Sequence, residues 1–200
     1  MEQSVFDLDL QNLKTEYRIV AALERISEAF RVLLWAESKK TGLSPIQIQI
    51  LIFILFQPAE RTTITQLARE FNLTKPTVSD SVKILEQKTL VMRSGRQGGG
   101  RGYTLSLSTG GIEVARSCSA FANAMSYPVQ LLDNTRRSNL LDSLLDMIRQ
   151  LHEAGVITTQ RMCKTCRFFE PGREQHYCVW MKQRLTVADL RLDCPEHADA

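Results

Sequence analysis

The chain has 200 residues, of which 44% are hydrophobic and 24% charged, and its net charge is +3. This composition is ordinary for a soluble protein of one or two domains with a packed core, and it excludes a polycation. The longest apolar run, Ile50–Phe56, is too short to cross a bilayer, and the first twenty residues show no secretory signal. We therefore expect a cytoplasmic protein that has no membrane partner.

A long amphipathic helix is expected first, followed by a buried one. Six apolar residues recur at roughly helical spacing, and Gly42 is expected to end this helix: Leu13, Tyr17, Val20, Leu23, Phe30 and Leu34. Ser44-Pro45-Ile46-Gln47 is typical of a helix start, with serine as the cap and proline at the first helical position. The helix that follows, to Phe56, is predicted to be buried on most sides.

Residues 63–85 have the pattern of two short helices separated by a break near Asn72. Thr63 and Gln66 form a capping-box pattern, and Thr74 is expected to cap the second helix, which runs to about Lys88. The start of that second helix exposes short polar and basic side chains. A helix is built in this way when its first turns enter a DNA major groove. The far faces are predicted to bury Leu67, Ala68, Val78, Val82 and Leu85.

A hairpin is expected next, with strand-like segments at Leu90–Met92 and Tyr103–Leu107. The intervening residues, 94–102, are rich in glycine and carry Arg96 and Arg101 at the tip. The tip lacks the following helix and the Lys-Ser or Lys-Thr pair of a nucleotide-binding loop. Between residues 61 and 103 the net charge is +5, with eight basic and three acidic residues, which exceeds the +3 of the whole chain. Such a local positive charge favours phosphate.

Two further helices are expected before the composition changes. Ser108 is predicted to cap a helix that ends before Pro128, and a leucine-rich helix runs from about Arg136 to Glu153. From Thr158 onward the aliphatic periodicity is lost, and cysteine, histidine and aromatic residues increase. We therefore predict a DNA-binding and dimerisation domain over residues 1–157 and a cysteine-rich extension over residues 158–200.

The chain resembles the MarR (multiple antibiotic resistance regulator) family of winged-helix transcription factors over roughly residues 10–155. The most specific stretch is Thr65–Arg93, TQLAREFNLTKPTVSDSVKILEQKTLVMR, and Leu107–Gly111 is similar to the family's exit from strand to helix. The resemblance implies a mainly α-helical winged helix-turn-helix with a two- to three-stranded wing. It also implies an obligate homodimer, formed by the first and last helices, that binds a pseudo-palindromic operator and usually represses transcription.

The sequence departs from that family in two places. The wing tip is glycine-rich and has no acidic residue, and Thr89 stands where the family often has glycine. Members of the family often bind small aromatic or anionic effectors, although no residue here identifies one. The residues expected to contact double-stranded DNA are Thr74, Lys75, Thr77, Ser79, Lys83, Arg93, Arg96 and Arg101.

Four of the five cysteines lie in the extension. Cys163 and Cys166 form one CxxC pair, and Cys178 and Cys194 follow. Four thiolates can complete a tetrahedral zinc site. A segment this short has too small a hydrophobic core to fold without a stabilising cross-link such as a metal ion. His176 or His197 could replace one thiolate. An iron–sulfur cluster and a thiol–disulfide switch are the alternatives, whereas Cys118 stands apart and is expected to be a small buried side chain.

These patterns predict a homodimeric DNA-binding regulator that represses and is not an enzyme. The expected zinc site is either structural or tunes DNA affinity, and metal loss or oxidation could move the extension and shift the recognition helices. The rivals are a redox or metal enzyme that uses the extension, and an interaction module that does not bind DNA. A closed four-thiolate zinc site has no open position for a substrate, which argues against the enzyme.

Overall fold

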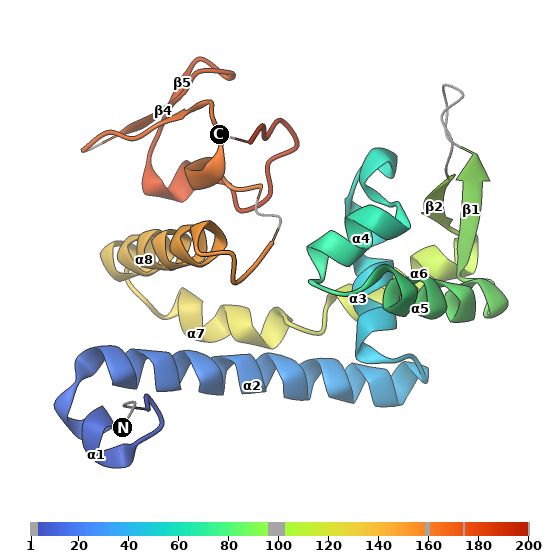
Figure 1. Cartoon of the computed structure of the whole chain (residues 1–200), viewed down its shortest axis with the longest axis horizontal. Coiled ribbons are helices and arrows are strands. Elements are labelled where there is room, and N and C mark those ends of the chain that lie inside the picture. The colour runs from blue at the N-terminus through green and yellow to red at the C-terminus, as the bar shows by residue number, and fades with distance from the viewer. Residues whose placement is uncertain (1–3, 96–102, 159–160, 174, 200) are drawn as a thin grey trace. The chain divides into compact units, whose positions relative to one another are not determined.

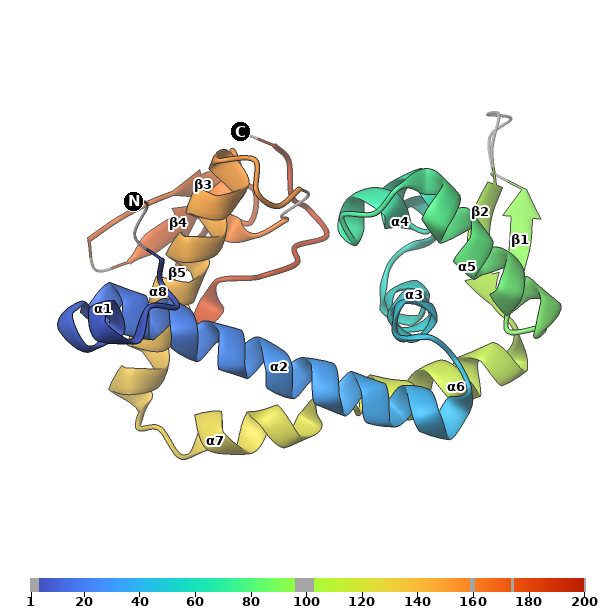
Figure 2. The same cartoon turned by 60° about the horizontal axis from the view of Figure 1, so that its bottom comes forward.

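The computed structural model describes residues 4–95, 103–158, 161–173 and 175–199. Figure 1 labels its α-helices and most of its strands, and Figure 2 also labels β3. The chain divides into two compact units, residues 1–62 with 80–124 and residues 63–79 with 125–200. Within the described residues, no helix has the length and apolar character that crossing a membrane requires.

The first unit begins with α1 (Leu8–Leu13), α2 (Thr15–Thr41) and α3 (Pro45–Phe56). Figure 2 shows α2 as one long helix without interruption, and Gly42 ends it in the left-handed conformation, with φ at 65°, as predicted. The predicted cap of α3 is also confirmed. Ser44 Oγ accepts a hydrogen bond from Gln47 N at 3.4 Å, and Ser44 N donates to Gln47 Oε1 at 2.9 Å.

The core of this unit is centred on α3, which packs against α6 (Thr109–Ser119). Ile48, Ile50 and Leu51 of α3 are fully buried, as the sequence predicts. Ser108 caps α6 by accepting a hydrogen bond from Gly111 N at 2.9 Å, which confirms that prediction. The helix ends at Ser119, well before the expected limit at Pro128.

The hairpin consists of β1 (Val91–Gly95) and β2 (Tyr103–Leu107), which pair antiparallel with Val91 opposite Leu107. The base of the hairpin is fixed to Thr62, just after the short helix η1 (Ala59–Arg61). Leu105 N donates to Thr62 O at 3.0 Å, and Thr62 Oγ1 donates to Leu105 O at 2.7 Å. Residues 96–102, with Arg96 and Arg101, lie outside the described residues.

Thr89 closes the end of α5 (Lys75–Gln87) in the left-handed conformation, with φ at 55°. Leu90 N donates to Leu85 O and Thr89 N to Glu86 O, both at 2.9 Å. These are the two hydrogen bonds of a Schellman ending, which usually has glycine at this position. A β-branched residue is strained there, by roughly 1–2 kcal/mol.

Replacing Thr89 with glycine is therefore expected to raise the free energy of unfolding by about 0.5–1 kcal/mol, because relief of strain exceeds the entropy that glycine adds to the unfolded chain. Urea unfolding followed by circular dichroism measures the change. Gln87→Gly is the control, since Gln87 is still helical, and it is expected to lower stability by up to about 1 kcal/mol. Equal destabilisation by both variants would contradict the strain at Thr89.

The second unit contains α4 (Ile64–Glu70), the first turn of α5, α7 (Ser126–Gln130) and α8 (Asn134–Glu153). Thr63 Oγ1 caps α4 by accepting from Gln66 N at 3.2 Å, as predicted. The helix expected from Arg136 is confirmed and begins two residues earlier, where Asp133 caps it. Pro128 lies inside α7 rather than after a helix, and its place in the first turn explains why it is tolerated.

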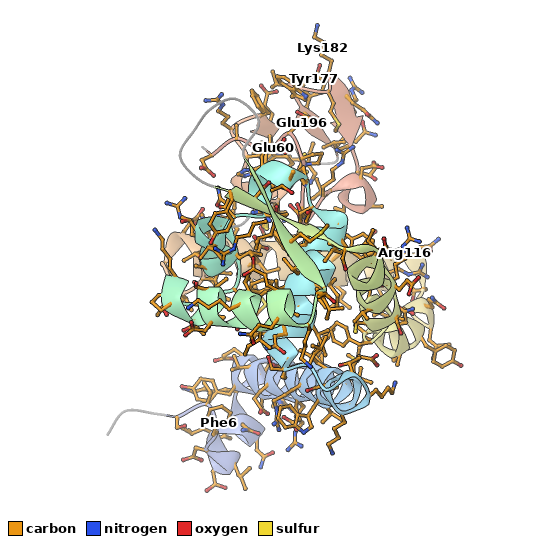
Figure 3. The ribbon with its side chains drawn as sticks, turned by 90° about the vertical axis from the view of Figure 1, so that its right-hand side faces the viewer. Phe6, Glu60, Arg116, Tyr177, Lys182 and Glu196 are labelled. Atoms are coloured by element: carbon orange, nitrogen blue, oxygen red, sulfur yellow. The ribbon has the colours of Figure 1, made fainter. Side chains whose placement is uncertain are left out.

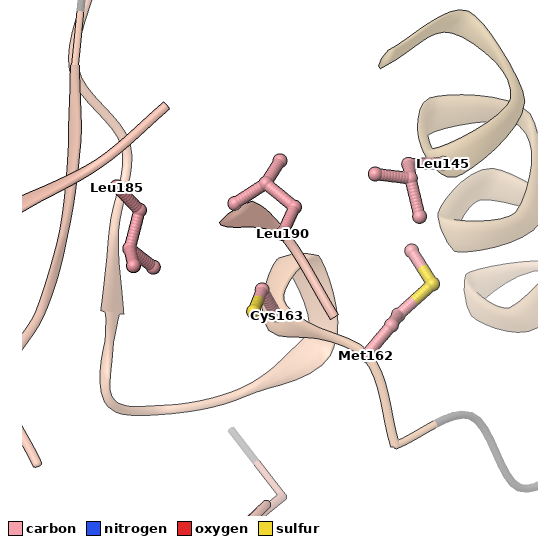
Figure 4. Close-up of a cluster of buried hydrophobic side chains, with 5 residues drawn as sticks. All are labelled: Leu145, Met162, Cys163, Leu185 and Leu190. Atoms are coloured by element: carbon pink, nitrogen blue, oxygen red, sulfur yellow. The ribbon is translucent and has the colours of Figure 1, made fainter. Parts of the chain in front are cut away.

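The extension adds a small antiparallel sheet that was not predicted from the sequence. Its strand order is β3-β4-β5, formed by Phe169–Glu170, His176–Cys178 and Gln183–Leu185. The short helices η3 (Cys163–Thr165) and η4 (Val187–Asp189) flank it. Figure 4 shows the core that the extension shares with α8, formed by Leu145, Met162, Cys163, Leu185 and Leu190.

Lys164 also ties the extension to α8. Its ammonium lies 2.5 Å from Asp142 Oδ1 and 2.9 Å from Asp146 Oδ1, and its side chain is only 8% exposed. Burial lowers the pKa of Lys164, but the hydrogen bonds to the two carboxylates outweigh it and raise the pKa above its usual value. The extension thus packs directly on α8 rather than hanging from it, and the boundary at residue 157 stays a prediction.

Candidate functional site

The turn between α4 and α5 has the geometry that a helix-turn-helix needs. Asn72 takes the left-handed conformation, with φ at 54°, and Leu73 N donates to Ala68 O at 2.9 Å. Asparagine tolerates this conformation better than most residues. All five apolar side chains predicted for the far faces of the two helices are buried: Leu67, Ala68, Val78, Val82 and Leu85.

The first turn of α5 exposes hydroxyl groups and one ammonium group. Thr74 caps the helix, because its Oγ1 accepts from Thr77 N at 3.3 Å, and the two threonine hydroxyls lie 2.8 Å apart. Thr74, Lys75 and Thr77 are exposed, whereas Ser79 is half-buried. Lys75 pairs with no acidic side chain in the part of the chain that the structure describes. Its charge therefore adds to the positive end of the helix dipole, which favours an anion.

The other two described basic candidates already have acidic partners. Lys83 Nζ lies 2.9 Å from Asp80 Oδ1, one turn earlier on α5, and this pair is exposed on both sides. An exposed ion pair of this kind adds little to the stability of the protein, so Lys83 can exchange Asp80 for a phosphate.

Arg93 makes two hydrogen bonds to Glu86, at 2.6 and 2.9 Å, and its guanidinium lies 4.4 Å from the centre of the Tyr103 ring. The hydrogen bond with Glu86 raises the pKa of Arg93. These contacts fix Arg93 at the base of the hairpin. Glu86 and Tyr103 were not among the predicted site residues, and only the pairing of β1 with β2 and the end of α5 reveal them.

A second candidate site lies in the extension, where the four cysteines converge. Cys163, Cys166, Cys178 and Cys194 all line one small cavity, with a volume of about 20 Å³. The remaining lining residues are mostly apolar or aromatic: Phe168, Phe169, Trp180, Met181, Leu185, Arg191 and Glu196. The sequence predicts these four cysteines as one ligand set, and the fold brings all four to the same cavity.

Short backbone contacts position these thiols. Cys166 N donates to Cys163 O at 3.0 Å within the CxxC turn, and Cys194 N donates to Arg161 O at 2.8 Å. Arg191 N donates to Cys163 Sγ at 3.2 Å, and Arg191 Nη1 lies 3.8 Å from Cys194 Sγ. The pKa of Cys163 is raised by burial, and the hydrogen bond from Arg191 opposes that effect. The four sulfurs form no disulfide. Arg191 contacts two of them, although no pattern in the sequence marks it as a site residue.

The two histidines named as alternates make other contacts. His176 Nδ1 accepts from Gly172 N at 3.2 Å, and its ring packs against Phe169. His197 Nε2 lies 3.1 Å from both Thr165 Oγ1 and Thr165 O. Neither histidine lines the cavity. Among the described side chains of histidine, cysteine, aspartate and glutamate, no group of three or more is arranged to hold a metal ion.

Cys118 lies on α6 and is fully buried. Burial raises the pKa of its thiol, and the neighbouring Glu37 raises it further, whereas Lys40 lowers it. A buried protonated thiol is a poor nucleophile and behaves as a small apolar side chain. This placement agrees with the expectation from sequence.

Arg161 joins the cysteine site to the helix-turn-helix. Its Nη2 lies 2.7 Å from Glu70 Oε2 at the end of α4, and its Nε lies 2.9 Å from Asp193 Oδ1, beside Cys194. Two neighbouring hydrogen bonds also join this segment to the helix-turn-helix. Thr158 Oγ1 donates to Arg69 O, and Asn72 Nδ2 donates to Val156 O. The extension therefore contacts the last turn of α4, and Val156, two residues before the extension, contacts the turn that leads into α5.

A helix-turn-helix followed by a two-stranded hairpin and a packed helix is the fold of winged-helix DNA-binding regulators. Residues 41–102 match the model of the MarR family. This segment runs from the end of α2 through the helix-turn-helix and into the hairpin. It covers less than half of the chain and includes none of the extension.

Solved structures of several transcriptional regulators share this fold. S. aureus MepR in complex with DNA is 20% identical, with a TM-score of 0.57 over 66% of this chain and 97% of that one. The transcriptional regulator PA3341 is 20% identical, with a TM-score of 0.59 over 68% and 98%. A MarR transcriptional regulator from Methanosarcina mazei Go1 is 15% identical, with a TM-score of 0.56 over 68% and 97%. No curated protein matches the sequence. The fold is thus that of MarR-type transcriptional regulators.

Proposed function

We propose that this protein is a member of the MarR family that binds double-stranded DNA sequence-specifically as a homodimer and represses transcription. The observation that carries the proposal is the start of α5, where Thr74, Lys75 and Thr77 are exposed on a helix whose opposite face is buried. The family match over the same residues supports it, as does the likeness to MepR, which has been solved in complex with DNA.

In this proposal, each candidate residue has a physical role. The hydroxyls of Thr74, Thr77 and Ser79 reach phosphates and base edges in the major groove, and Lys75 pairs with a phosphate at the positive end of α5. Lys83 and Arg93 bind the backbone by exchanging their acidic partners for phosphates. Arg96 and Arg101 at the wing tip are proposed for the minor groove, where negative potential is enhanced.

The test is a mobility-shift titration of the full chain against genomic DNA fragments at several salt concentrations. A DNA-binding regulator is expected to select a few fragments and to lose affinity steeply as salt rises, because each phosphate contact releases counterions. Binding to no fragment at low salt would contradict the proposal and favour an interaction module instead.

Exposed apolar side chains support the proposed dimer. Phe6, just before α1, is 62% exposed, and α1 and α2 expose several more large apolar side chains. Figure 3 labels the side chain of Phe6. On α2, Ile19, Ile26 and Phe30 are exposed at spacings of seven and four, which places them on one stripe. In the other unit, α8 exposes Leu140 and Leu151. Faces of this kind are usually covered by a partner subunit.

Sedimentation equilibrium is expected to give about twice the 22.7 kDa of one chain, at micromolar concentration and without DNA. The physical reason is that the exposed stripe on α2 and the apolar residues of α8 would otherwise remain in contact with water. A single species of one chain's mass over the whole concentration range would contradict the dimer. DNA binding by a single chain is a separate question, which the mobility-shift titration answers.

We further propose that the extension tunes DNA affinity through Arg161. The ion pair between Arg161 and Glu70 connects the cysteine site with α4, so a change at the cysteines can bias the helix-turn-helix. Arg161→Met is expected to change operator affinity several-fold, within the usual range of such couplings. The control is Arg149→Met, which removes a comparable pair with Glu153 on the surface of α8. Equal affinities for Arg161→Met and wild type would overturn this coupling.

A further inference from the structure

A groove with a volume of about 660 Å³ lies along the first half of α8. Val129 of α7 and Ala188 of η4 also line it, and η4 packs against α8 within the second unit. Ligand pockets in proteins usually have volumes of about 300–1,000 Å³, so the groove is large enough for a small organic molecule. Because Ala188 belongs to the extension, this groove includes a part of the chain that the family match does not cover.

The residues of α8 that line the groove change from polar to apolar along the helix. The polar ones come first: Asn134, Arg137 and Ser138. The apolar ones follow: Leu140, Leu141 and Leu144. Residues three, four and seven positions apart lie on the same side of a helix, so these side chains form one stripe. Between Arg137 and Leu144 the stripe extends for about 10 Å, at roughly 1.5 Å per residue. The groove thus has a polar end and an apolar floor.

The positive charge of Arg137 is not neutralised by a carboxylate of the protein. Its Nη2 donates to Leu132 O at 2.9 Å, and its side chain pairs with no acidic residue in the described part of the chain. A guanidinium carries several N–H donors in a fork that matches a carboxylate, and this one hydrogen bond leaves most of them available. None of the described residues that line the groove is acidic.

The acidic residues next to the lining residues in the sequence have partners elsewhere. Asp133 accepts from Arg136 N at 2.9 Å, and its other oxygen lies 3.5 Å from Arg136 Nε. Asp189 accepts from the N–H and the hydroxyl of Thr186, at 2.8 and 2.7 Å. Asp142 is held by the lysine ammonium of the extension, at 2.5 Å. The polar end of the groove therefore favours an anionic group from outside the chain.

We propose that this groove binds an amphipathic organic anion that has a carboxylate at one end of an unbranched hydrocarbon chain. The carboxylate accepts hydrogen bonds from the guanidinium of Arg137, beside the amide of Asn134 and the hydroxyl of Ser138. The hydrocarbon chain lies along the leucines of α8 and is removed from water there. Leu141 also packs against the core of the extension, so the bound chain contacts that core.

A second copy of the protein is the competing occupant of the groove. Leu140 is 41% exposed and also supports the proposed dimer, in which a partner subunit would cover it. Charge favours the organic anion, because a partner that covered the groove with an apolar surface would bury the unpaired Arg137. The proposal does not depend on DNA binding, and the two are tested by separate experiments.

The experiment is calorimetric titration of the full chain with decanoate below the concentration at which it forms micelles, and with decanol as its uncharged counterpart. Arg137→Met is expected to weaken decanoate binding about tenfold and to leave decanol binding unchanged, because only the carboxylate forms charge-assisted hydrogen bonds. Arg136→Met is the matched control, since Arg136 pairs with Asp133 and does not line the groove, and it is expected to bind both compounds as the wild type does.

A third variant tests the location of the bound molecule. Ala188 is exposed on η4, so Ala188→Trp fills the groove without disturbing a core and is expected to weaken the binding of both compounds about tenfold or more. Wild type that binds no decanoate would overturn the proposal, as would equal effects of Arg136→Met and Arg137→Met or unchanged binding in Ala188→Trp. If no decanoate binds and Ala188→Trp sediments as a single chain, a second copy occupies the groove instead.

Discussion

Replacing Gly111 with alanine is expected to destabilise the protein by about 3 kcal/mol, a shift of roughly 6–12 °C in the midpoint of thermal unfolding. A Cβ atom at this position would lie 2.0 Å from the carbonyl oxygen of Leu90 and 2.9 Å from its carbon. Both are backbone atoms, so no side-chain rotation relieves the clash. The first turn of α6 would have to move away from the segment that joins α5 to the hairpin.

The neighbouring glycine supplies the matched control. A Cβ at Gly110 would meet nothing nearer than Ser108 Oγ at 4.0 Å, so Gly110→Ala is expected to be neutral or to stabilise by a few tenths of a kcal/mol. Thermal unfolding of the two variants side by side measures the difference. Similar midpoints for both would show that α6 does not approach Leu90 so closely.

Replacing Lys75 with alanine is expected to weaken operator binding about tenfold, and to lower the slope of log affinity against log salt by about one per protomer. The physical reason is that Lys75 is exposed at the first turn of α5 and pairs with no acid in the described part of the chain. It thus offers a full charge to a phosphate without breaking an ion pair. Titration of one selected DNA fragment at four or more salt concentrations gives both quantities.

Two further variants make this result specific. Lys39→Ala removes the same kind of side chain from the last turn of α2 and is expected to leave both affinity and slope unchanged. Lys83→Ala is expected to have a smaller effect than Lys75→Ala, because Lys83 must first leave Asp80. If the slope of log affinity against log salt is unchanged in Lys75→Ala, then Lys75 does not contact a phosphate, whatever the effect of the substitution on affinity.

Local features of the structure agree well with the predictions from sequence. Ser44, Thr63, Thr74 and Ser108 all cap the helices that they were expected to cap, and Gly42 ends α2. Caps and helix ends depend on residues three or four positions apart, so their pattern is complete in the sequence. The position of Pro128 is a different case. Proline is compatible both with the residue after a helix and with the first turn of a helix, so the sequence does not show that Pro128 lies inside α7.

The site formed by the four cysteines depends on contacts between residues that are distant in the sequence. The CxxC pair and two later cysteines indicate a common site by their number and spacing alone. The sequence contains no information on the size of the space between them, which depends on how β3, β4 and β5 pair and on the aromatic residues that line the cavity. The gathering of the four thiols around one cavity therefore follows only from the folded extension.

By itself, the sequence determined the helix-turn-helix, the hairpin, the buried faces of α3 and α5 and the membership of the four cysteines in one group, because each depends on short-range periodicity or spacing. Only the tertiary structure decided the partners of Arg93, the close approach of Gly111 to Leu90, and the link from Arg161 to Glu70 across 91 residues. Contacts of this kind join side chains that no local pattern relates, and they form only once the chain has closed its loops.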